Sequence, residues 1–228
     1  MPTKSDSLAA IKQQGILPMF FNADEKIGVK IMEALYRGGM RVIEFTNRGP
    51  EAQKVYNALK TTRDAQYPDL FIGVGTIKTV DDAHTFIDAG ADFIIAPGTI
   101  PEVGRIVVQA GLLWSPGCMT VTEIMVAEEN GSQLIKLFPG NVLGPSYIGA
   151  VREIFPKVSF MPTGGVELER DSISAWFKTG ACAVGMGSKL VSKPLMESER
   201  YDTIEERAKQ VLGIITNYRK PEAEKAAE

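Results

Sequence analysis

Histidine and cysteine are both scarce in this chain of 228 residues. The sequence has one histidine, His84, and two cysteines, Cys118 and Cys182, which form no CxxC pair. One histidine excludes a metal site built on several imidazoles and argues against a Ser-His-Asp triad. We expect His84, which falls in a helical pattern, to be a surface or interface residue, and we expect no metal and no other cofactor. Both thiols should be reduced, with Cys118 either a buried core thiol or part of a site near a strand end.

The sequence also lacks a basic excess and a long apolar run. Its net charge is −3, so no positive field is available to hold nucleic acid, and no DNA- or RNA-binding signature is present. No run of about eighteen apolar residues could span a membrane. The N-terminal stretch MPTKSDSLAAIKQQG contains no apolar signal core. We therefore expect a cytoplasmic protein that binds neither nucleic acid nor membrane.

One pattern recurs along the whole chain: a short apolar run, a polar break, a helical period and then a glycine. The stretches between the runs have apolar residues three and four positions apart, which is typical of amphipathic helices. Several begin at proline or an acidic residue and end at glycine, as helices do. The apolar runs themselves predict strands at ILPMFF (16–21), RVIEFT (41–46), LFIGVGT (70–76), FIIAPG (93–98), LLWSPG (112–117), LIKLFP (134–139), VSFMPTGG (158–165) and ACAVGMGS (181–188).

Eight strand–helix units in about 200 residues predict a (β/α)8 TIM barrel, because strands that alternate with helices form a parallel sheet. An additional N-terminal helix, residues 5–14, is expected to cap the bottom of the barrel, and residues 202–220 form the eighth helix. A doubly wound open sheet is the alternative, although no GxGxxG follows the first strand. We expect residues 1–228 to form a single barrel domain, with residues 220–228 as a frayed tail.

A lysine interrupts the sixth apolar run, LIKLFPG (134–140). An ammonium buried without a partner costs several kcal/mol, so its presence in such a run calls for an explanation. The period of two puts Leu134, Lys136 and Phe138 on one face, which would point the amine into the barrel if that face lines the interior. Two interpretations are open: a strand-end lysine whose amine reaches solvent, or a functional lysine.

The second apolar run, RVIEFTNR, is likewise interrupted by a charged residue, the carboxylate Glu44. Alternation puts Val42, Glu44, Thr46 and Arg48 on one face of that strand. Glu44 is flanked by apolar residues, and buried charges need partners whether or not they do chemistry. It is therefore either half of a structural salt bridge or a reacting group.

Glycines follow the last two predicted strands, in PTGG (162–165) and VGMGS (184–188). The loops after the seventh and eighth strands are where barrels usually bind phosphate, because glycine exposes backbone N–H groups to an anion. Glycine is also common in ordinary turns between strand and helix, so each glycine pair alone is weak evidence for phosphate binding. Their occurrence in both loops together favours phosphate.

A neutral, desolvated lysine attacks carbonyl carbons and forms Schiff bases, and a nearby carboxylate can move protons. With a phosphate cradle, this combination suits making or breaking a carbon–carbon bond beside a ketone, on a phosphorylated keto acid. Two other classes remain: a metal-dependent sugar-phosphate epimerase, which the single histidine argues against, and a non-catalytic barrel that only binds a keto acid phosphate.

Seven motifs, in order, resemble those of the 2-keto-3-deoxy-6-phosphogluconate (KDPG) aldolase family, which includes the 4-hydroxy-2-oxoglutarate (KHG) aldolases. The likeness covers residues from about 7 to 215. The motifs are GGMRVIEFTNR, GVGTI, FIIAPG, SPGCMTVTE, IKLFP, MPTGGV and VGMGSKLV. The resemblance implies a class I aldolase on a (β/α)8 barrel that assembles as a homotrimer.

The resemblance also implies roles for individual residues. Lys136 matches the Schiff-base lysine and Glu44 the acid/base glutamate, while Arg48 and Thr76 match the residues that hold the substrate carboxylate. The remaining matches are the pyruvate-pocket residues Pro97 and Phe138 and the phosphate-binding positions Gly164, Gly165 and Ser188, with Gly187 beside them.

Three positions near the expected mouth of the site depart from the family pattern. Gly140-Asn141 stands where the family often has Ala-Glu, Asn47 where many members have Leu, and GMGSK where many have GGSW. These departures leave open which substrate is preferred. The candidates are KDPG, its galactonate-derived analogue and unphosphorylated 4-hydroxy-2-oxoglutarate.

Overall fold

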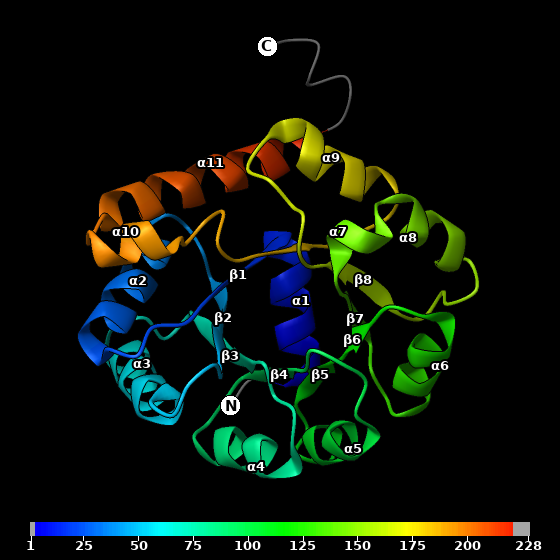
Figure 1. The fold of residues 1–228 in the computed structure, drawn as a ribbon, viewed down its shortest axis with the longest axis horizontal. Helices are drawn as coiled ribbons and strands as arrows, with labels where there is room; N and C mark the ends of the chain where they lie inside the picture. Colours follow the sequence, from blue (N-terminus) through cyan, green and yellow to red (C-terminus); the bar gives the residue numbers. More distant parts are fainter. Residues whose placement is uncertain (1–2, 221–228) are drawn as a thin grey trace.

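The computed structural model describes residues 3–220, in which helices form a ring around a barrel of strands (Figure 1). The tail predicted for residues 220–228 lies outside the described residues, apart from Lys220. No helix within residues 3–220 is both long and apolar enough to cross a membrane.

The strand ladders are parallel, as the alternation of strands and helices predicted. The strands are β1 (Ile16–Phe20), β2 (Val42–Thr46), β3 (Phe71–Gly75), β4 (Phe93–Ile95), β5 (Leu113–Ser115), β6 (Gly117–Cys118), β7 (Leu134–Leu137), β8 (Ser159–Pro162) and β9 (Val184–Met186). Six of them pair in the order β5-β4-β3-β2-β1-β9 and three in the order β6-β7-β8.

These two groups of strands close into one barrel. On one side the chain runs directly from β5 into β6 through Pro116, and on the other a bridge between Thr163 and Gly185 joins the end of β8 to β9. A doubly wound open sheet would have two free edges instead. The predicted (β/α)8 barrel is therefore confirmed, and the open sheet is not the fold of this chain.

The fifth predicted strand, residues 112–117, is divided into β5 and β6. Proline has no N–H to donate to a ladder, and Pro116 lies at the division. Its carbonyl still accepts a hydrogen bond of 2.9 Å from the N–H of Lys136. The chain thus changes its pairing partner at Pro116, from β4 before the proline to β7 after it.

The predicted long helices are all present and surround the barrel. Two short ones, of four and five residues, were not predicted because they are too short to show a period. The helices are α1 (Lys4–Gln14), α2 (Glu25–Arg37), α3 (Ala52–Gln66), α4 (Val80–Asp88), α5 (Pro101–Gln109), α6 (Val121–Glu129), α7 (Gly140–Leu143), α8 (Ser146–Val151), α9 (Arg170–Lys178), α10 (Lys193–Glu197) and α11 (Tyr201–Arg219).

The N-terminal helix α1 lies across the end of the barrel where the strands begin, near its centre in the view of Figure 1. Ile11 is fully buried among side chains of the barrel interior. The hydroxyl of Ser7 donates a hydrogen bond of 2.9 Å to the carbonyl of Asp92, at the start of β4. The predicted cap at the bottom of the barrel is confirmed.

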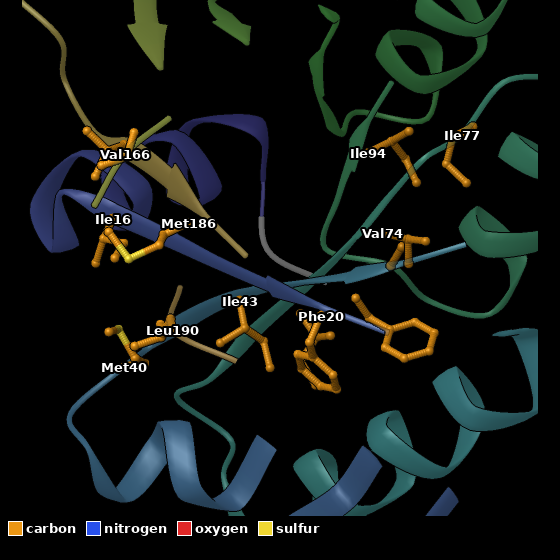
Figure 2. Close-up of a cluster of buried hydrophobic side chains, with 14 of the residues drawn as sticks. Ile16, Phe20, Met40, Ile43, Val74, Ile77, Ile94, Val166, Met186 and Leu190 are labelled. Atoms are coloured by element: carbon orange, nitrogen blue, oxygen red, sulfur yellow. The ribbon is translucent and has the colours of Figure 1, made fainter. Parts of the chain in front are cut away.

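Apolar side chains form two separate layers on the two faces of the strands. The outer layer, between strands and helices, includes Ile43 and Ile94, which Figure 2 shows together with neighbouring outer residues. The inner layer fills the lower barrel and includes Val42, Leu134 and Met161. Because side chains alternate along a strand, this division tells which polar residues face the interior.

Candidate active site

Glu44 and Lys136 both face the barrel interior, as the alternation predicted. Val42 belongs to the inner layer and Ile43 and Phe45 to the outer one, which puts Glu44 inside. Lys136 likewise follows the inner residue Leu134 by two positions. The interpretation of Lys136 as a strand-end lysine reaching solvent is wrong, because its side chain is only 8% exposed.

The ammonium of Lys136 and the carboxylate of Glu44 form a buried but loose pair. Their Nζ and Oε1 atoms are 3.7 Å apart, and Glu44 is completely buried. Neither carboxylate oxygen accepts a hydrogen bond from any residue that the structure describes. Buried carboxylate oxygens nearly always have donors, so this site is ready to accept protons from a hydroxyl group or water.

A glycine at the end of β3 makes room for the Glu44 carboxylate. A Cβ atom at Gly75 would overlap Oε1 of Glu44. The next residue, Thr76, adopts a left-handed backbone with φ of 64°, which is rare for a β-branched residue. Such a conformation costs of order 1–3 kcal/mol and is often found at functional sites. Thr76 thus lies directly beyond the strand position that accommodates Glu44.

A cleft of about 670 Å³ opens at the carboxyl ends of β1, β2, β8 and β9. Of the predicted site residues, it is lined by Arg48, Phe138, Gly164, Gly187 and Ser188. Thr76, Pro97 and Gly165 are not part of its lining, and neither are Glu44 and Lys136. The structure therefore brings one half of the predicted set together around an open cleft and keeps the Lys–Glu pair buried in the interior.

Arg48 lies beyond the end of β2 and lines the cleft together with Thr46, the residue that alternation puts on the same face. Its side chain is exposed and makes no hydrogen bond or ion pair with the residues described. Its backbone N–H bonds the carbonyl of Thr46 at 2.9 Å, which turns the chain away from the strand. The guanidinium is thus free to bind an anion in the cleft.

Phe138 and Pro97 lie close to the lysine strand. The ring centroid of Phe138 is 5.7 Å from the Lys136 Nζ, within the range of a cation–π contact, and the ring is 38% exposed. The bond from Phe138 to Pro139 is cis. The carbonyl of Pro97 lies so close to Gly117 that a Cβ there would overlap it, and Gly117 is the register partner of Lys136.

The glycine loop after β8 has a backbone that only glycine adopts easily. Gly164 and Gly165 have φ of 93° and 73°. The N–H groups of Gly165 and of Ser188, after β9, have no acceptor among the described residues. Unpaired N–H groups at one mouth of a barrel can bind an anion such as phosphate.

Gly140-Asn141, whose role the sequence left open, supports this loop. The N–H of Gly140 donates a hydrogen bond of 2.7 Å to the carbonyl of Thr163. A Cβ at Gly140 would come within 2.6 Å of the Gly164 carbonyl, and Asn141 packs closely against Gly165. Only a residue without a side chain lets helix α7 approach the loop this closely.

Sequence analysis missed Thr163 as a site residue. It lies in the cleft lining, is only 5% exposed, and its Oγ1 has no hydrogen-bond partner among the described residues. A signal was present, because Thr163 falls within the motif MPTGGV and two residues after the inner residue Met161. Cleft residues of α10 were missed as well, since a helix of five residues carries no periodic pattern.

The scarce residue types lie outside the cleft lining. His84 is exposed on α4, as expected. Cys118 is a buried core thiol, 1% exposed, and burial raises its pKa to about 12. Cys182 also carries a free thiol, and burial raises its pKa to about 11. Within residues 3–220, no three His, Cys, Asp or Glu side chains are grouped so that they could hold a metal ion.

Known proteins resemble this chain in both sequence and structure. The sequence model of the family described as "Aldolase: KDPG and KHG aldolase" matches residues 8–207. A 2-dehydro-3-deoxy-phosphogluconate aldolase of Pseudoalteromonas atlantica is 30% identical over 92% of this chain and 95% of its own. A 2-dehydro-3-deoxy-6-phosphogalactonate aldolase of Escherichia coli is 28% identical over 82% of this chain and 85% of its own.

A solved structure agrees with these relatives. The KDPG aldolase of Legionella pneumophila superimposes with a TM-score of 0.82 at 29% identity, over 90% of this chain and 97% of that one. In that structure, pyruvate is captured as a covalent carbinolamine intermediate.

Proposed function

Because the chain belongs to the KDPG and KHG aldolase family, and is thus a class I aldolase that acts on a carbon–carbon bond, we propose that Lys136 and Glu44 carry its chemistry. The proposed reaction cleaves KDPG to pyruvate and glyceraldehyde 3-phosphate. The observation that carries the assignment is the buried pair of Lys136 and Glu44, 3.7 Å apart, with both carboxylate oxygens open to a donor.

The reaction begins when Glu44 takes a proton from the ammonium of Lys136 and the resulting amine attacks the C2 ketone of the substrate. Glu44 then passes that proton to the C2 oxygen. Loss of water gives an iminium ion, which withdraws electrons from the C3–C4 bond. Glu44 takes the proton of the C4 hydroxyl as that bond breaks, and the aldehyde product leaves. The remaining enamine is reprotonated at C3 with help from Glu44, and water then releases pyruvate and the free lysine.

The two anionic ends of the substrate need separate partners. We assign the carboxylate to Arg48 and Thr76, since the guanidinium is unpaired and opens into the cleft. Pro97 and Phe138 line the pyruvate part of the pocket. The phosphate is assigned to Gly164, Gly165, Gly187 and Ser188, which is supported by the N–H groups of Gly165 and Ser188, for which the described residues offer no acceptor.

Three substrates fit this chemistry: KDPG, the galactonate-derived phosphate, and 4-hydroxy-2-oxoglutarate, which would give pyruvate and glyoxylate. The glycine loops favour a phosphorylated substrate over 4-hydroxy-2-oxoglutarate. The two sugar acid phosphates differ at one hydroxyl-bearing carbon, so a comparison of kcat/KM for all three substrates decides the preference.

Borohydride trapping tests the assignment of the lysine. Reduction in the presence of pyruvate should add a stable mass to the protein, and peptide mapping should place it on Lys136. Lys189→Ala, which changes an exposed lysine outside the cleft, serves as the matched control and should retain the adduct. No adduct in the wild-type protein, or an undiminished one in Lys136→Ala, would refute the proposal.

We also propose that the enzyme is a homotrimer located in the cytoplasm. An apolar patch on α6 and the loop before it supports self-association: Met119, Val121 and Met125 are 41%, 41% and 58% exposed. Val121 and Met125 lie one helical turn apart, on one side of α6. Light scattering after size-exclusion chromatography gives the mass, and Met125→Lys should reduce it to that of a monomer.

The proposed location of the enzyme in the cytoplasm is favoured by its substrate, because a multiply charged molecule crosses lipid poorly.

A further inference from the structure

The outer part of the cleft has an uneven distribution of charge. Among all the residues that line it, three carry a formal charge: Arg48, Lys193 and Glu197. Arg48 comes from the loop after β2, whereas Lys193 and Glu197 come from α10, which follows the loop of Ser188. A substrate with a carboxylate at one end and a phosphate at the other thus meets two cations in the cleft, one from the loop after β2 and one from α10.

Two contacts hold α10 at this mouth. The N–H groups of Leu190 and Val191 both donate to the carbonyl of Gly187 at 2.9 Å, which folds the chain back directly after the glycine loop. From the loop after β1, the amide of Asn22 donates a hydrogen bond of 3.9 Å to the sulfur of Met196 in α10. Lys193 is therefore held at the same rim as Gly187 and Ser188.

The ammonium of Lys193 is weakly held within the protein. Among residues 3–220 it pairs with Glu197 alone, at 3.6 Å, and both side chains are well exposed, by 79% and 65%. Exposed pairs of this kind contribute little to stability. Lys193 can thus exchange Glu197 for a stronger anionic partner at low cost.

We propose that Lys193 binds the phosphate group and makes the enzyme prefer phosphorylated keto acids over unphosphorylated ones. This inference rests on the proposed function. The N–H groups of the glycine loops offer a phosphate dianion dipoles but no formal positive charge, and Arg48 is assigned to the carboxylate. Lys193 supplies the missing charge from the rim. Glu197 competes with the phosphate for that lysine and weakens its binding.

The test compares two neighbouring lysines on two substrates. Lys193→Met removes the charge and keeps the apolar stem. Lys189→Met does the same at an exposed lysine that is paired with Glu167 at 2.8 Å and does not line the cleft. For Lys193→Met, kcat/KM with KDPG should fall about five- to tenfold, mainly through KM. With 4-hydroxy-2-oxoglutarate it should change less than about twofold, and Lys189→Met should match wild type on both.

Three further measurements sharpen the test. Inorganic phosphate should inhibit wild type competitively against KDPG, and its inhibition constant should rise about as much in Lys193→Met as KM does. Glu197→Gln should lower that constant a few-fold, and added salt should reduce all these differences because the charges are exposed.

Equal losses on both substrates, or no loss on either, would overturn the inference. Failure of the proposed function has a different signature, the absence of a pyruvate adduct at Lys136 in the wild-type protein. An adduct that forms normally in Lys193→Met while the substrate preference stays unchanged refutes the role of Lys193 alone.

Discussion

Two buried ion pairs lie at opposite ends of the barrel and are built differently. At the end capped by α1, the Arg63 Nη1 lies 2.7 Å from the Asp92 Oδ2 and also donates to the carbonyl of Leu70 at 2.7 Å. The same carboxylate oxygen accepts the N–H of Ile72 at 2.7 Å. The pair thus ties the end of α3 to the beginnings of β3 and β4.

At the open end, Lys136 and Glu44 are 3.7 Å apart, and no hydrogen bond from the described residues reaches either oxygen of Glu44. In the first pair one carboxylate oxygen, Asp92 Oδ2, accepts short bonds, and the other, Oδ1, has no partner among the described residues. In the second pair both oxygens are open, which keeps the capacity of Glu44 for a substrate. The contrast predicts that changes at the first pair lower stability and changes at the second lower activity.

Lys136→Met should have the largest effect on activity of any change considered. Without an amine no iminium ion forms, so kcat/KM should fall by roughly 10³-fold or more. A coupled lactate dehydrogenase assay for pyruvate measures the loss, and circular dichroism checks the fold. Turnover within tenfold of wild type would remove Lys136 from the mechanism.

Glu44→Gln should lower kcat by about 10²–10⁴-fold, the usual contribution of a general acid–base group. The amide keeps the size of the side chain but cannot take the C4 hydroxyl proton. Borohydride should still trap pyruvate on Lys136, since the amine is intact. A fall in binding with kcat unchanged would instead assign Glu44 a purely structural role.

Arg63→Met tests the opposite end. Removal of one partner leaves the Asp92 carboxylate buried without its cation, which should lower the free energy of unfolding by about 3–5 kcal/mol. Urea denaturation measures this change. Arg105→Met, at an exposed pair with Glu102, should change it by less than about 0.5 kcal/mol. Folded Arg63→Met should keep its kcat, and a large loss of kcat would show that the two ends are coupled.

Gly140→Ala should have a moderate effect confined to the phosphate end. The new Cβ would lie 2.6 Å from the Gly164 carbonyl, so the glycine loop must shift. We expect KM for KDPG to rise about tenfold, a typical consequence of a small displacement at a binding site. Steady-state kinetics with KDPG and 4-hydroxy-2-oxoglutarate separates this from a general defect, which would affect both.

Gly213→Ala is the matched control for Gly140→Ala, and we expect it to have the smallest effect of these changes. Gly213 lies within α11, and nothing lies within 4 Å of a Cβ placed there. Alanine should stabilise the helix by up to about 1 kcal/mol, visible as a higher thermal midpoint with unchanged kinetics. A destabilised Gly213→Ala would mean that its surroundings are tighter than the structure indicates.

Periodicity predicted the positions of the strands and the inward direction of Glu44 and Lys136. Alternation in a strand is a local property, so it survives in the fold wherever the strand is regular. It failed at Pro116, where the ladder changes partner, and it did not show that β2 ends before Arg48. It also missed α7 and α10, whose places depend on contacts with distant loops.

By itself, the sequence determined the class of fold, the order of the elements and the residue types available for chemistry, because these follow from hydrophobic period and composition. The tertiary structure alone decided the spacing of Lys136 and Glu44 and left the Glu44 carboxylate without a hydrogen-bond donor from the part of the chain that is described. It also explains why residue 140 is glycine, since a Cβ there would collide with the Gly164 carbonyl. These features depend on atoms brought together from strands and loops far apart in the chain, and no local pattern records such distances.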